Sequence, residues 1–510
     1  MTARAISLQE LLRGRADAGA AGDIVVRGLA LDSRRVRTGD AFVALAGLHA
    51  HGIAYAPAAA AHGAAVILAE TVPADAVPAA PGFDVAAAAP RKREEAGVPI
   101  VWIDGLSGAL GPIASRFFDE PSRALRVIGV TGTNGKTSVV QLLAQALRRS
   151  GHRVATIGTL GAGVDGELRD VERTTPDAIA VHGLLAEFRA DGAAYVAMEV
   201  SSHALEQGRV NGVAFELAVF TNLTRDHLDY HGTMHAYGAA KQRLFAWPDL
   251  AAAIVNVDDA FGRALLSTVP PAVARLRYGI ERDDAEVVAL ELESTVAGQR
   301  FRLRTPWGEA AVTTPLLGRF NVSNLLAVAA CLGRVGLPID EIASTLAALE
   351  PVAGRMSRLG GAGAQPLVVV DYAHTPDALE QALTSLRAHC AGRLICVFGC
   401  GGERDAGKRP LMGAIAEALA DRVVVTDDNP RGEDGDAIVA QILAGLARPD
   451  AALVERDRAA AIARAIGAAG PGYVVLIAGK GHEPYQEIAG AKRPFDDLAT
   501  ARGALERGPC

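Results

Sequence analysis

The chain has 510 residues, more than one hydrophobic core can hold together, and at about 150 residues per domain it predicts about three domains. Hydrophobic residues make up 50% and charged residues 21%, as in ordinary soluble globular proteins. Lys and Arg total 51 and Asp and Glu total 58, so the net charge is −7. This balance excludes a general nucleic-acid binder with a basic surface and leaves room for local basic pockets.

Neither the cysteines nor the apolar stretches indicate an extracellular or membrane protein. The first 15 residues lack the apolar core of a signal peptide, and the Ala-rich apolar stretches are short and interrupted. We therefore expect a cytoplasmic protein. The five irregularly spaced cysteines predict reduced structural thiols, with a reactive or metal-binding role as the alternative: Cys331, Cys390, Cys396, Cys400 and Cys510.

The first third of the chain predicts an irregular mixture of helix and extended segments. We expect a helix over 6–12, extended segments over 24–31 and 41–46, and an Ala-rich helix from 54 that runs into a strand over 65–68. The stretch from Thr71 to Val98 is rich in Pro, Ala and Gly and holds a charge cluster, which predicts a long loop or insertion. A basic docking site is the alternative.

From Leu125 onward, strand-like and helix-like runs alternate. Expected strands are 126–130, 194–200, 217–221, 254–257, 367–370, 394–398, 423–426 and 474–478, and expected helices include 139–149, 378–387 and 411–420. Such alternation predicts an α/β fold of parallel sheets with sites at the carboxyl ends of the strands. Boundaries near Pro121 and near 352–358 divide the chain into domains 1–122, 123–351 and 352–510.

The most informative segment is the phosphate-loop pattern between Val127 and Ser138, where an apolar strand enters a Gly/Thr/Asn loop and then a helix. Backbone N–H groups freed by glycine, together with a helix N-terminus, form a cradle for anions. Lys136 can neutralise the β- and γ-phosphates, and Thr137 can bind Mg²⁺. The generic pattern is not fully met, because Val130 replaces its first glycine. A plain glycine-rich turn is the alternative.

The run Thr131-Gly-Thr-Asn-Gly-Lys-Thr-Ser138 resembles the Mur ligase superfamily, the ATP-dependent ligases that add amino acids to peptidoglycan precursors, together with folylpolyglutamate synthases. Further matching strings follow in order over nearly the whole chain: 198–203, 222–232, 237–241, 318–324 and 371–377. The resemblance implies an N-terminal UDP-sugar-binding domain, a central P-loop-type ATP-binding α/β domain and a C-terminal Rossmann-like α/β domain that binds the amino acid.

The resemblance also implies the nucleotide and metal sites. Catalytic roles fall to Lys136, Glu199, His227 and Lys241, and Mg²⁺ ligands are Thr137, Glu199, His227 and Lys241. The lysine at position 241 is expected to be carbamylated by CO₂, which converts a cation into an anion that helps to hold a second Mg²⁺. From the residues alone, His227 would be a histidine in a surface loop, and Lys241 would be a solvated lysine on a helix. The ATP-binding set is Gly132, Thr133, Asn134, Gly135, Lys136, Thr137, Ser138, Asn321, Arg355, Asp371 and His374.

The C-terminal part resembles the branch of the family that adds meso-2,6-diaminopimelate. Asp428-Asn429-Pro430-Arg431 follows a strand, and a guanidinium at Arg431 fits the far carboxylate of diaminopimelate, which lysine lacks. Arg404 is a second candidate for a substrate carboxylate, and Gly479 and Glu483 match positions at the zwitterionic end. A simple Asn-Pro turn is the alternative for the first string.

The nucleotide-sugar end is assigned by the same resemblance. It places Leu31, Ser33, Leu48, His49 and Ala50 in the N-terminal domain, and Thr174, Thr175, Ser201, Gln207 and Arg209 around the muramoyl-dipeptide. Arg173 departs from the family, since some relatives carry Asn before the two threonines.

We therefore expect an ADP-forming ligase that adds meso-diaminopimelate to the UDP-muramoyl-dipeptide through an acyl phosphate. Its small-molecule partners are ATP and these two substrates, without nucleic acid or membrane insertion, and we expect a monomer. The alternatives are a lysine-adding homologue, a folylpolyglutamate synthase-like ligase and a non-catalytic nucleotide-binding regulator.

Overall fold

The computed structural model describes residues 5–47, 50–71, 94–295, 297–361 and 363–507. The chain divides into two compact units. Unit one comprises Met1–Thr131, His152–Ala218 and Gly238–Ala252, and unit two comprises Gly132–Gly151, Val219–Tyr237 and Ala253–Cys510. Leu48, His49 and most of the predicted 71–98 insertion lie outside the described residues. The predicted division into three domains stays a prediction.

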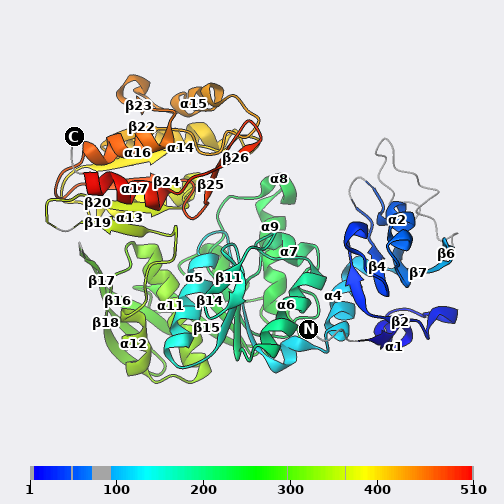
Figure 1. Cartoon of the computed structure of the whole chain (residues 1–510). Coiled ribbons are helices and arrows are strands. Elements are labelled where there is room, and N and C mark those ends of the chain that lie inside the picture. Colours follow the sequence, from blue (N-terminus) through cyan, green and yellow to red (C-terminus); the bar gives the residue numbers. More distant parts are fainter. Residues whose placement is uncertain (1–4, 48–49, 72–93, 296, 362, 508–510) are drawn as a thin grey trace. The chain divides into compact units, whose positions relative to one another are not determined.

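Unit one begins with a small sheet that has helices on both faces (Figure 1). Its strands lie in the order β3 (Gly28–Ala30), β4 (Asp40–Ala44), β5 (Val66–Thr71), β7 (Val98–Asp104) and β6 (Glu94–Glu95), and all but β6 are parallel. Alternate residues of β4 and β5 face opposite layers. Val43 and Leu68 pack under α1 (Leu8–Leu12) and α4 (Leu106–Phe117), while Phe42 and Ile67 pack under α2 (Ala56–Ala61).

Three predicted boundaries in this part are wrong. The helix expected from Ile6 begins at Leu8, because Ser7 caps it by accepting the Glu10 N–H, while Ile6 and Ser7 form strand β1 and pair with β2 (Val25–Val26). The extended segment 24–31 is split into β2 and β3 at Arg27. The Ala-rich helix ends at Ala61, and the strand that follows it runs over Val66–Thr71.

The rest of unit one contains five neighbouring strands of a second, eleven-stranded sheet, in the order β11 (Glu167–Arg169), β10 (Gly161–Val164), β9 (Val154–Gly158), β12 (Tyr195–Glu199) and β8 (Arg126–Thr131). Strand β12 is parallel to β8 and β9, with Glu199 opposite Val130. The carboxyl ends of these strands therefore meet at one edge, which carries Glu199 and the start of the phosphate loop. Helices α6 (Ala178–Ala190) and α7 (Ser202–Glu206) follow, and β13 (Phe215–Phe220), α9 (Met234–Gln242) and β14 (Ala252–Asn256) each have residues in both units.

Unit two holds the helix after the phosphate loop, α5 (Lys136–Arg149), and four neighbouring long strands of the eleven-stranded sheet. The strands are β15 (Ala274–Ile280), β16 (Val287–Thr295), β17 (Gly298–Thr305) and β18 (Gly308–Thr314). Strands β16, β17 and β18 form an antiparallel meander. Helices α11 (Arg319–Val335) and α12 (Ile339–Ala347) pack on it, and α5 packs on α11. Short helices α8 (Leu228–His231) and α10 (Ala260–Leu265) complete this part.

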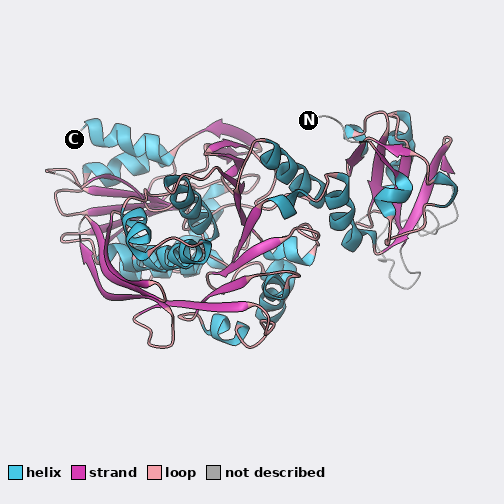
Figure 2. Cartoon of the chain, turned by 90° about the horizontal axis from the view of Figure 1, so that it is seen from below, coloured by secondary structure: helices cyan, strands magenta, loops and turns pink. Residues whose placement is uncertain are grey.

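The last part of unit two is a three-layer α/β sandwich, seen from two sides in Figures 1 and 2. Its sheet has the order β19 (Ser357–Gly360), β20 (Leu367–Asp371), β24 (Val474–Ala478), β21 (Leu394–Phe398), β22 (Arg422–Val425) and β23 (Leu453–Val454), parallel except for β19. Helices α13 (Pro376–Arg387), α14 (Lys408–Leu419) and α15 (Gly435–Leu443) cover one face, and α16 (Arg458–Gly467) and α17 (Asp497–Arg507) the other. A hairpin of β25 (Tyr485–Ile488) and β26 (Ala491–Pro494) follows β24.

The predicted α/β class with parallel sheets is thus confirmed, and the strands predicted after residue 350 each lie within two residues of those in the structure. Within the described residues, no helix has the length and apolar character needed to cross a membrane.

A buried ion pair stabilises the sandwich. Arg458 Nε and Nη2 donate to the two carboxylate oxygens of Asp497 over 2.7 and 2.8 Å, and both side chains are fully buried. Arg458 Nη2 also donates to the carbonyl oxygen of Ala478 (3.0 Å), at the end of β24. We expect Asp497→Asn to lower the free energy of unfolding by about 3–5 kcal/mol, because it leaves a buried guanidinium without its counter-charge.

Urea unfolding measures this effect. The control is Glu293→Gln, which removes an exposed partner of Arg300 at 3.8 Å and should cost at most about 1 kcal/mol. Equal losses in the two variants would contradict the role given to Asp497.

Candidate functional site

The phosphate loop connects β8 to α5 and has the geometry of an anion cradle. Gly132 has φ +151°, and a Cβ there would lie 1.9 Å from Thr221 Oγ1, so only glycine fits. Lys136 is the first residue of α5, and its Nζ donates to the carbonyl oxygens of Gly132 and Thr133 over 2.8 Å each. The ammonium therefore lies across the loop, where N–H groups and a helix N-terminus favour phosphate.

Side chains from distant segments hold this loop. The Asn134 N–H donates to Asn222 Oδ1 (2.9 Å), and Thr221 Oγ1 donates to the Asn134 carbonyl oxygen (2.6 Å). The Asn134 side-chain amide donates to Asp377 Oδ2 over 2.9 Å, and Thr224 Oγ1 donates to the same oxygen over 3.3 Å. Asp377 lies in the first turn of α13, so the sandwich and the phosphate loop share a hydrogen-bond network.

The residues predicted for the adenosine side lie close together in unit two. The Arg355 guanidinium lies 4.5 Å from the centre of the Tyr372 ring, and its Nη2 is 3.3 Å from Thr137 Oγ1. Asp371 is buried at the end of β20 and accepts the Met356 N–H over 2.8 Å. Burial raises the pKa of Asp371 to about 6, against the attraction of Arg355. His374 Nδ1 contacts the Tyr372 carbonyl oxygen at 2.8 Å, and burial lowers the pKa of His374 to about 4.

Asn321 is buried in the first turn of α11, near the loop. Its amide donates to the Leu317 carbonyl oxygen (2.8 Å), and its oxygen accepts from Asn324 Nδ2 (3.1 Å). A Cβ on Gly135 would lie 2.8 Å from Asn324 Oδ1, which places this asparagine pair against the phosphate loop.

In unit one, Glu199 is a buried carboxylate held in a fixed orientation at the end of β12. Its Oε1 accepts the Thr159 N–H over 2.8 Å, and its Oε2 lies 3.3 Å from Thr159 Oγ1. Thr159 Oγ1 also lies 3.1 Å from Thr174 Oγ1. The carboxylate is thus oriented by neutral donors, as is typical of a metal ligand.

The residues predicted for the muramoyl-dipeptide adjoin Glu199. Thr175 Oγ1 donates to the Glu199 carbonyl oxygen (2.8 Å) and accepts the Ser201 N–H (3.1 Å). Arg209 donates to Gln207 Oε1 over 2.6 and 2.9 Å and to the Thr175 carbonyl oxygen over 3.0 Å. One cluster therefore contains all five predicted residues, Thr174 included.

Three of the predicted nucleotide-sugar residues are described, and they lie at the carboxyl ends of the strands of the first sheet. Leu31 follows β3, Ser33 is buried in the short helical turn after it, and Ala50 is exposed after β4. Nearby, Glu70 is a buried carboxylate that accepts the N–H groups of Ala46 and Ser107, each over 3.0 Å. It ties the loop after β4 to the start of α4.

The four predicted metal ligands belong two to each unit. Thr137 and His227 lie in unit two, and Glu199 and Lys241 lie in unit one. His227 has φ +53° and its Nε2 lies 3.3 Å from Asp226 Oδ2. Lys241 is 1% exposed in α9, so the solvated lysine weighed as an alternative is wrong.

The residues predicted to bind the amino-acid substrate lie in the sandwich, most of them beyond the carboxyl ends of β22 and β24. Arg431 has φ +53°, which is unusual for a residue with a Cβ. Its N–H donates to the Glu487 carbonyl oxygen (3.0 Å) and its own carbonyl accepts the Ala489 N–H (2.7 Å), so the β25–β26 hairpin holds this conformation. Arg431 Nη1 donates to the Gly402 carbonyl oxygen over 2.7 Å, while its Nε is 3.8 Å from Glu487 Oε2.

Asp428, Asn429 and Pro430 are buried beside the loop that follows β24. Asn429 Nδ2 donates to Glu483 Oε2 over 2.8 Å. A Cβ on Gly479, which has φ +116°, would lie 2.4 Å from Asp428 Oδ2, so glycine permits this close approach. The structure therefore brings Asp428, Asn429, Gly479 and Glu483 together.

Arg404 is exposed in the loop after β21. A Cβ on Gly401 would lie 2.9 Å from Arg431 Nη1 and 3.7 Å from Arg404 Cγ, so the two arginines flank the same glycine.

Sequence reasoning missed several residues that orient the site. Tyr372 and Asp377 lie inside the string 371–377, and Lys480 lies between the predicted residues Gly479 and Glu483, so their positions are a signal that could have singled them out. Thr159, which orients Glu199, and Glu70 stand outside these strings and carry no such signal.

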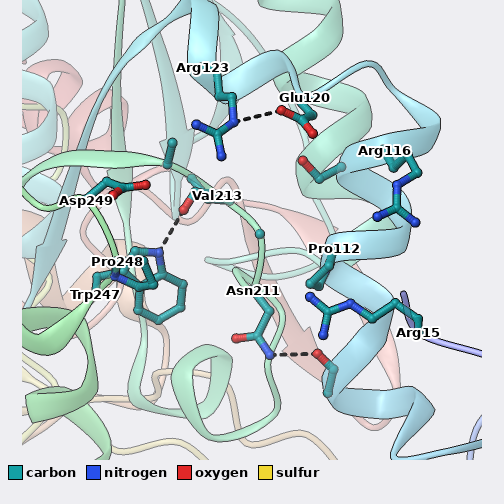
Figure 3. Close-up of a pocket in the computed structure, with 14 residues that line it drawn as sticks. Arg15, Pro112, Arg116, Glu120, Arg123, Asn211, Val213, Trp247, Pro248 and Asp249 are labelled. Atoms are coloured by element: carbon teal, nitrogen blue, oxygen red, sulfur yellow. Dashed lines mark hydrogen bonds and ion pairs between the residues drawn. The ribbon is translucent and has the colours of Figure 1, made fainter. Parts of the chain in front are cut away.

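A hollow of about 600 Å³ in unit one contains none of the predicted residues (Figure 3). Arg116 lies on one side and Trp247 on the other. Several of its polar groups have protein partners: Arg123 pairs with Glu120 at 2.7 Å, Asn211 donates to the Gly108 carbonyl oxygen, and Trp247 donates to the Val213 carbonyl oxygen. We therefore place the candidate site at the strand ends and not in this hollow.

Models of three protein families match the chain in succession. The Mur ligase family, catalytic domain, matches residues 25–118; the Mur ligase middle domain matches 130–332; and the Mur ligase, glutamate ligase domain, matches 354–481.

Curated and solved proteins give the same result. A protein of Xanthomonas campestris pv. campestris, named UDP-N-acetylmuramoyl-L-alanyl-D-glutamate–2,6-diaminopimelate ligase, is 57% identical over 505 residues, which is 98% of each chain. A solved structure of a ligase of this name is 36% identical over 99% of each chain, with a TM-score of 0.71. The folylpolyglutamate synthase of Mycobacterium tuberculosis shares the fold at 20% identity, over 78% of this chain and 95% of its own, with a TM-score of 0.61.

The raised pKa of Asp371 predicts a pH-dependent cost to stability. An ordinary aspartate has a pKa of 3.8, so holding Asp371 ionised at a folded-state value of about 6 costs on the order of 2–3 kcal/mol. This cost is complete above pH 6, shrinks as the pH falls through 6, and is gone near pH 4. We expect ligand-free Asp371→Asn to unfold at a higher temperature than the parent at pH 7.5, with little difference at pH 4.5.

Thermal unfolding at the two pH values checks this. Asp421→Asn serves as the control of opposite sign, since Arg387 lowers the pKa of that exposed carboxyl and its removal should bring no gain at pH 7.5. A gain for Asp371→Asn that is equally large at both pH values would contradict the argument.

Proposed function

Because the chain belongs to the Mur ligase family, we propose that it joins meso-2,6-diaminopimelate to UDP-N-acetylmuramoyl-L-alanyl-D-glutamate at the expense of ATP, in the synthesis of peptidoglycan precursors. The observation that supports this substrate assignment is the pair of adjoining loops in the sandwich. One presents the Arg431 guanidinium and the other the Glu483 carboxylate. The far end of diaminopimelate has an amine, as lysine does, and an additional carboxylate that lysine lacks, and these match the Glu483 carboxylate and the Arg431 guanidinium.

Mur ligases use ATP and Mg²⁺, and the phosphate loop fits the nucleotide. Lys136 and the loop N–H groups would bind the β- and γ-phosphates, and Arg355, stacked on Tyr372, would add positive charge. Asp371 would accept the ribose hydroxyls, and His374 and Asn321 would line the same region. In this arrangement the D-glutamyl carboxylate attacks the γ-phosphate to give an acyl phosphate and ADP. The incoming amine then attacks the acyl carbon, forms the amide and releases inorganic phosphate and a proton.

The predicted metal ligands fit Mg²⁺ by their chemistry. Glu199 offers a buried carboxylate whose orientation Thr159 fixes, and Thr137 offers a hydroxyl, both hard oxygen donors. His227 completes the proposed set. The metal, when bound, neutralises charge on the phosphates. Glu199 and Thr137 would hold it. The muramoyl-dipeptide would be oriented by a second group of residues: Thr174, Thr175, Ser201, Gln207 and Arg209.

We further propose that Lys241 is carbamylated. Its burial supports this, because carbamylation needs a neutral amine and burial penalises the charged ammonium. Reaction with CO₂ forms an N–C bond, releases one proton and leaves an anion, which suits a second Mg²⁺. Leu31, Ser33, Leu48, His49 and Ala50 are proposed for the uridine-sugar end. That the protein is a monomer and that it acts in the cytoplasm both stay predictions.

The alternatives have less support. A lysine-adding ligase would leave Arg431 without a substrate carboxylate, and a folylpolyglutamate synthase-like activity would leave the N-terminal sheet without a ligand. A regulator without turnover would have no use for an oriented Glu199 and a buried Lys241.

The function is tested by phosphate release with ATP, Mg²⁺ and the UDP-muramoyl-dipeptide, comparing diaminopimelate, lysine and ornithine. We expect turnover with diaminopimelate and little with the other two. Arg431→Gly should raise the KM for diaminopimelate about 30- to 5,000-fold, because a buried partner of a carboxylate is worth roughly 2–5 kcal/mol.

Glycine is the sharpest replacement, since φ +53° suits it and the backbone bonds to the hairpin remain. The thermal unfolding temperature of the Arg431→Gly variant should therefore not fall, and the KM of the variant for ATP should be unchanged. Equal use of lysine by the parent, or unchanged kinetics of the variant, would refute the substrate assignment.

Carbamylation of Lys241 is tested by chemical rescue. Lys241→Ala should lose most activity, and a short carboxylic acid such as acetate should restore part of it by supplying the missing anion. Ethylamine at the same concentration is the matched control, since it would replace an unmodified lysine. Rescue by the amine alone, or full activity of the variant without either, would end this proposal.

A further inference from the structure

Lys480 is a fully buried cation in the turn between β24 and β25, and the proposed function gives it no role. Its Nζ donates to Asn429 Oδ1 over 2.9 Å and to Glu483 Oε2 over 3.1 Å. The ammonium also lies 5.6 Å from the centre of the Tyr485 ring. A buried ammonium is costly unless it is paired, and Lys480 is paired with two residues proposed to bind the amino acid.

These contacts use one oxygen of Glu483 and not the other. Oε2 accepts from both Lys480 Nζ and Asn429 Nδ2, the latter over 2.8 Å. Asn429 cannot rotate freely, because its Oδ1 also accepts the Glu487 N–H over 2.9 Å. Within the described part of the chain, no hydrogen bond to Glu483 Oε1 is present.

We propose that Lys480 is a positioning residue for diaminopimelate. Together with Asn429 it holds Glu483 Oε2, fixes the orientation of the carboxylate and leaves Oε1 for the ammonium of the substrate. It also joins the loop that contains Asn429 and Arg431 to the loop that contains Glu483. The distance between the Arg431 guanidinium and the Glu483 carboxylate, the two charged groups proposed to bind the amino acid, is thereby fixed before the substrate binds.

This inference rests on the proposed role of Glu483. The competing explanation is that Lys480 only neutralises a buried carboxylate and supports the fold. That explanation predicts a loss of stability on substitution, without a selective effect on one substrate.

A double-mutant cycle separates the two explanations. The variants are Lys480→Met, which keeps the length and burial of the side chain, Glu483→Gln, and the double variant. Each is assayed in the full chain for the KM of diaminopimelate, ATP and the UDP-muramoyl-dipeptide, and for its thermal unfolding temperature.

We expect each single variant to raise the KM for diaminopimelate about 10- to 100-fold, the size of a lost hydrogen bond to a charged group. The double variant should be no worse than Glu483→Gln, because Lys480 acts through Glu483. The KM values for ATP and the UDP-muramoyl-dipeptide should stay within about twofold of the parent values. Lys492→Met is the matched control: Lys492 is exposed, also lies over Tyr485 at 4.4 Å, and should leave every KM unchanged.

Multiplied effects in the double variant, or a parallel rise in the KM for ATP, would overturn the inference. If Glu483→Gln leaves the KM for diaminopimelate unchanged, the proposed site itself fails. If Glu483→Gln raises that KM and Lys480→Met does not, only the inference fails. Should Lys480→Met fold poorly because Glu483 loses its counter-charge, the double variant carries neither charge, and its comparison with Glu483→Gln still decides.

Discussion

Electrostatic repulsion is the constraint on which the whole arrangement depends, because every proposed substrate brings phosphate or carboxylate to a chain that itself carries a net charge of −7. The structure meets it with cations whose hydrogen bonds and ring contacts are made with neutral groups. Arg355 lies on the ring of Tyr372, and Arg431 donates to a backbone carbonyl with Glu487 at 3.8 Å. Arg458, which supports the fold, instead donates two hydrogen bonds to the carboxylate of Asp497. The charges meant for substrate are thus distinguished from those that support the fold.

The same logic explains how much of the site could be predicted from the sequence. A loop that binds phosphate or a guanidinium that binds a carboxylate is encoded within a few consecutive residues, so the strings around Lys136 and Arg431 were enough to propose both. The residues that orient these groups are brought together by folding. Thr159 contacts Glu199 across 40 positions, and Asp377 contacts Asn134 across 243. No spacing rule in a single sequence connects such pairs.

The fold was predictable to a similar degree. Parallel strands of the sandwich are buried on both faces and read as short apolar runs, which is why their positions were correct. The meander of β16, β17 and β18 was not predicted, although Arg300, Phe301, Arg302, Leu303 and Arg304 alternate between polar and apolar as a half-buried strand should. At the first helix, one hydrogen bond from the Glu10 N–H to the Ser7 hydroxyl oxygen sets the boundary, and composition does not reveal so local an effect.

The bond between Asp377 and the phosphate loop has a consequence for the timing of the catalytic cycle. Asn134 and Thr224 share one carboxylate oxygen of Asp377, so any movement that carries α13 away from the loop must break both bonds together. A nucleotide that steadies the loop therefore also steadies α13. Release of ADP and mobility of the part proposed to bind the amino acid then accompany each other, and a ligand that holds α13 against the loop would slow the release of the nucleotide without touching it.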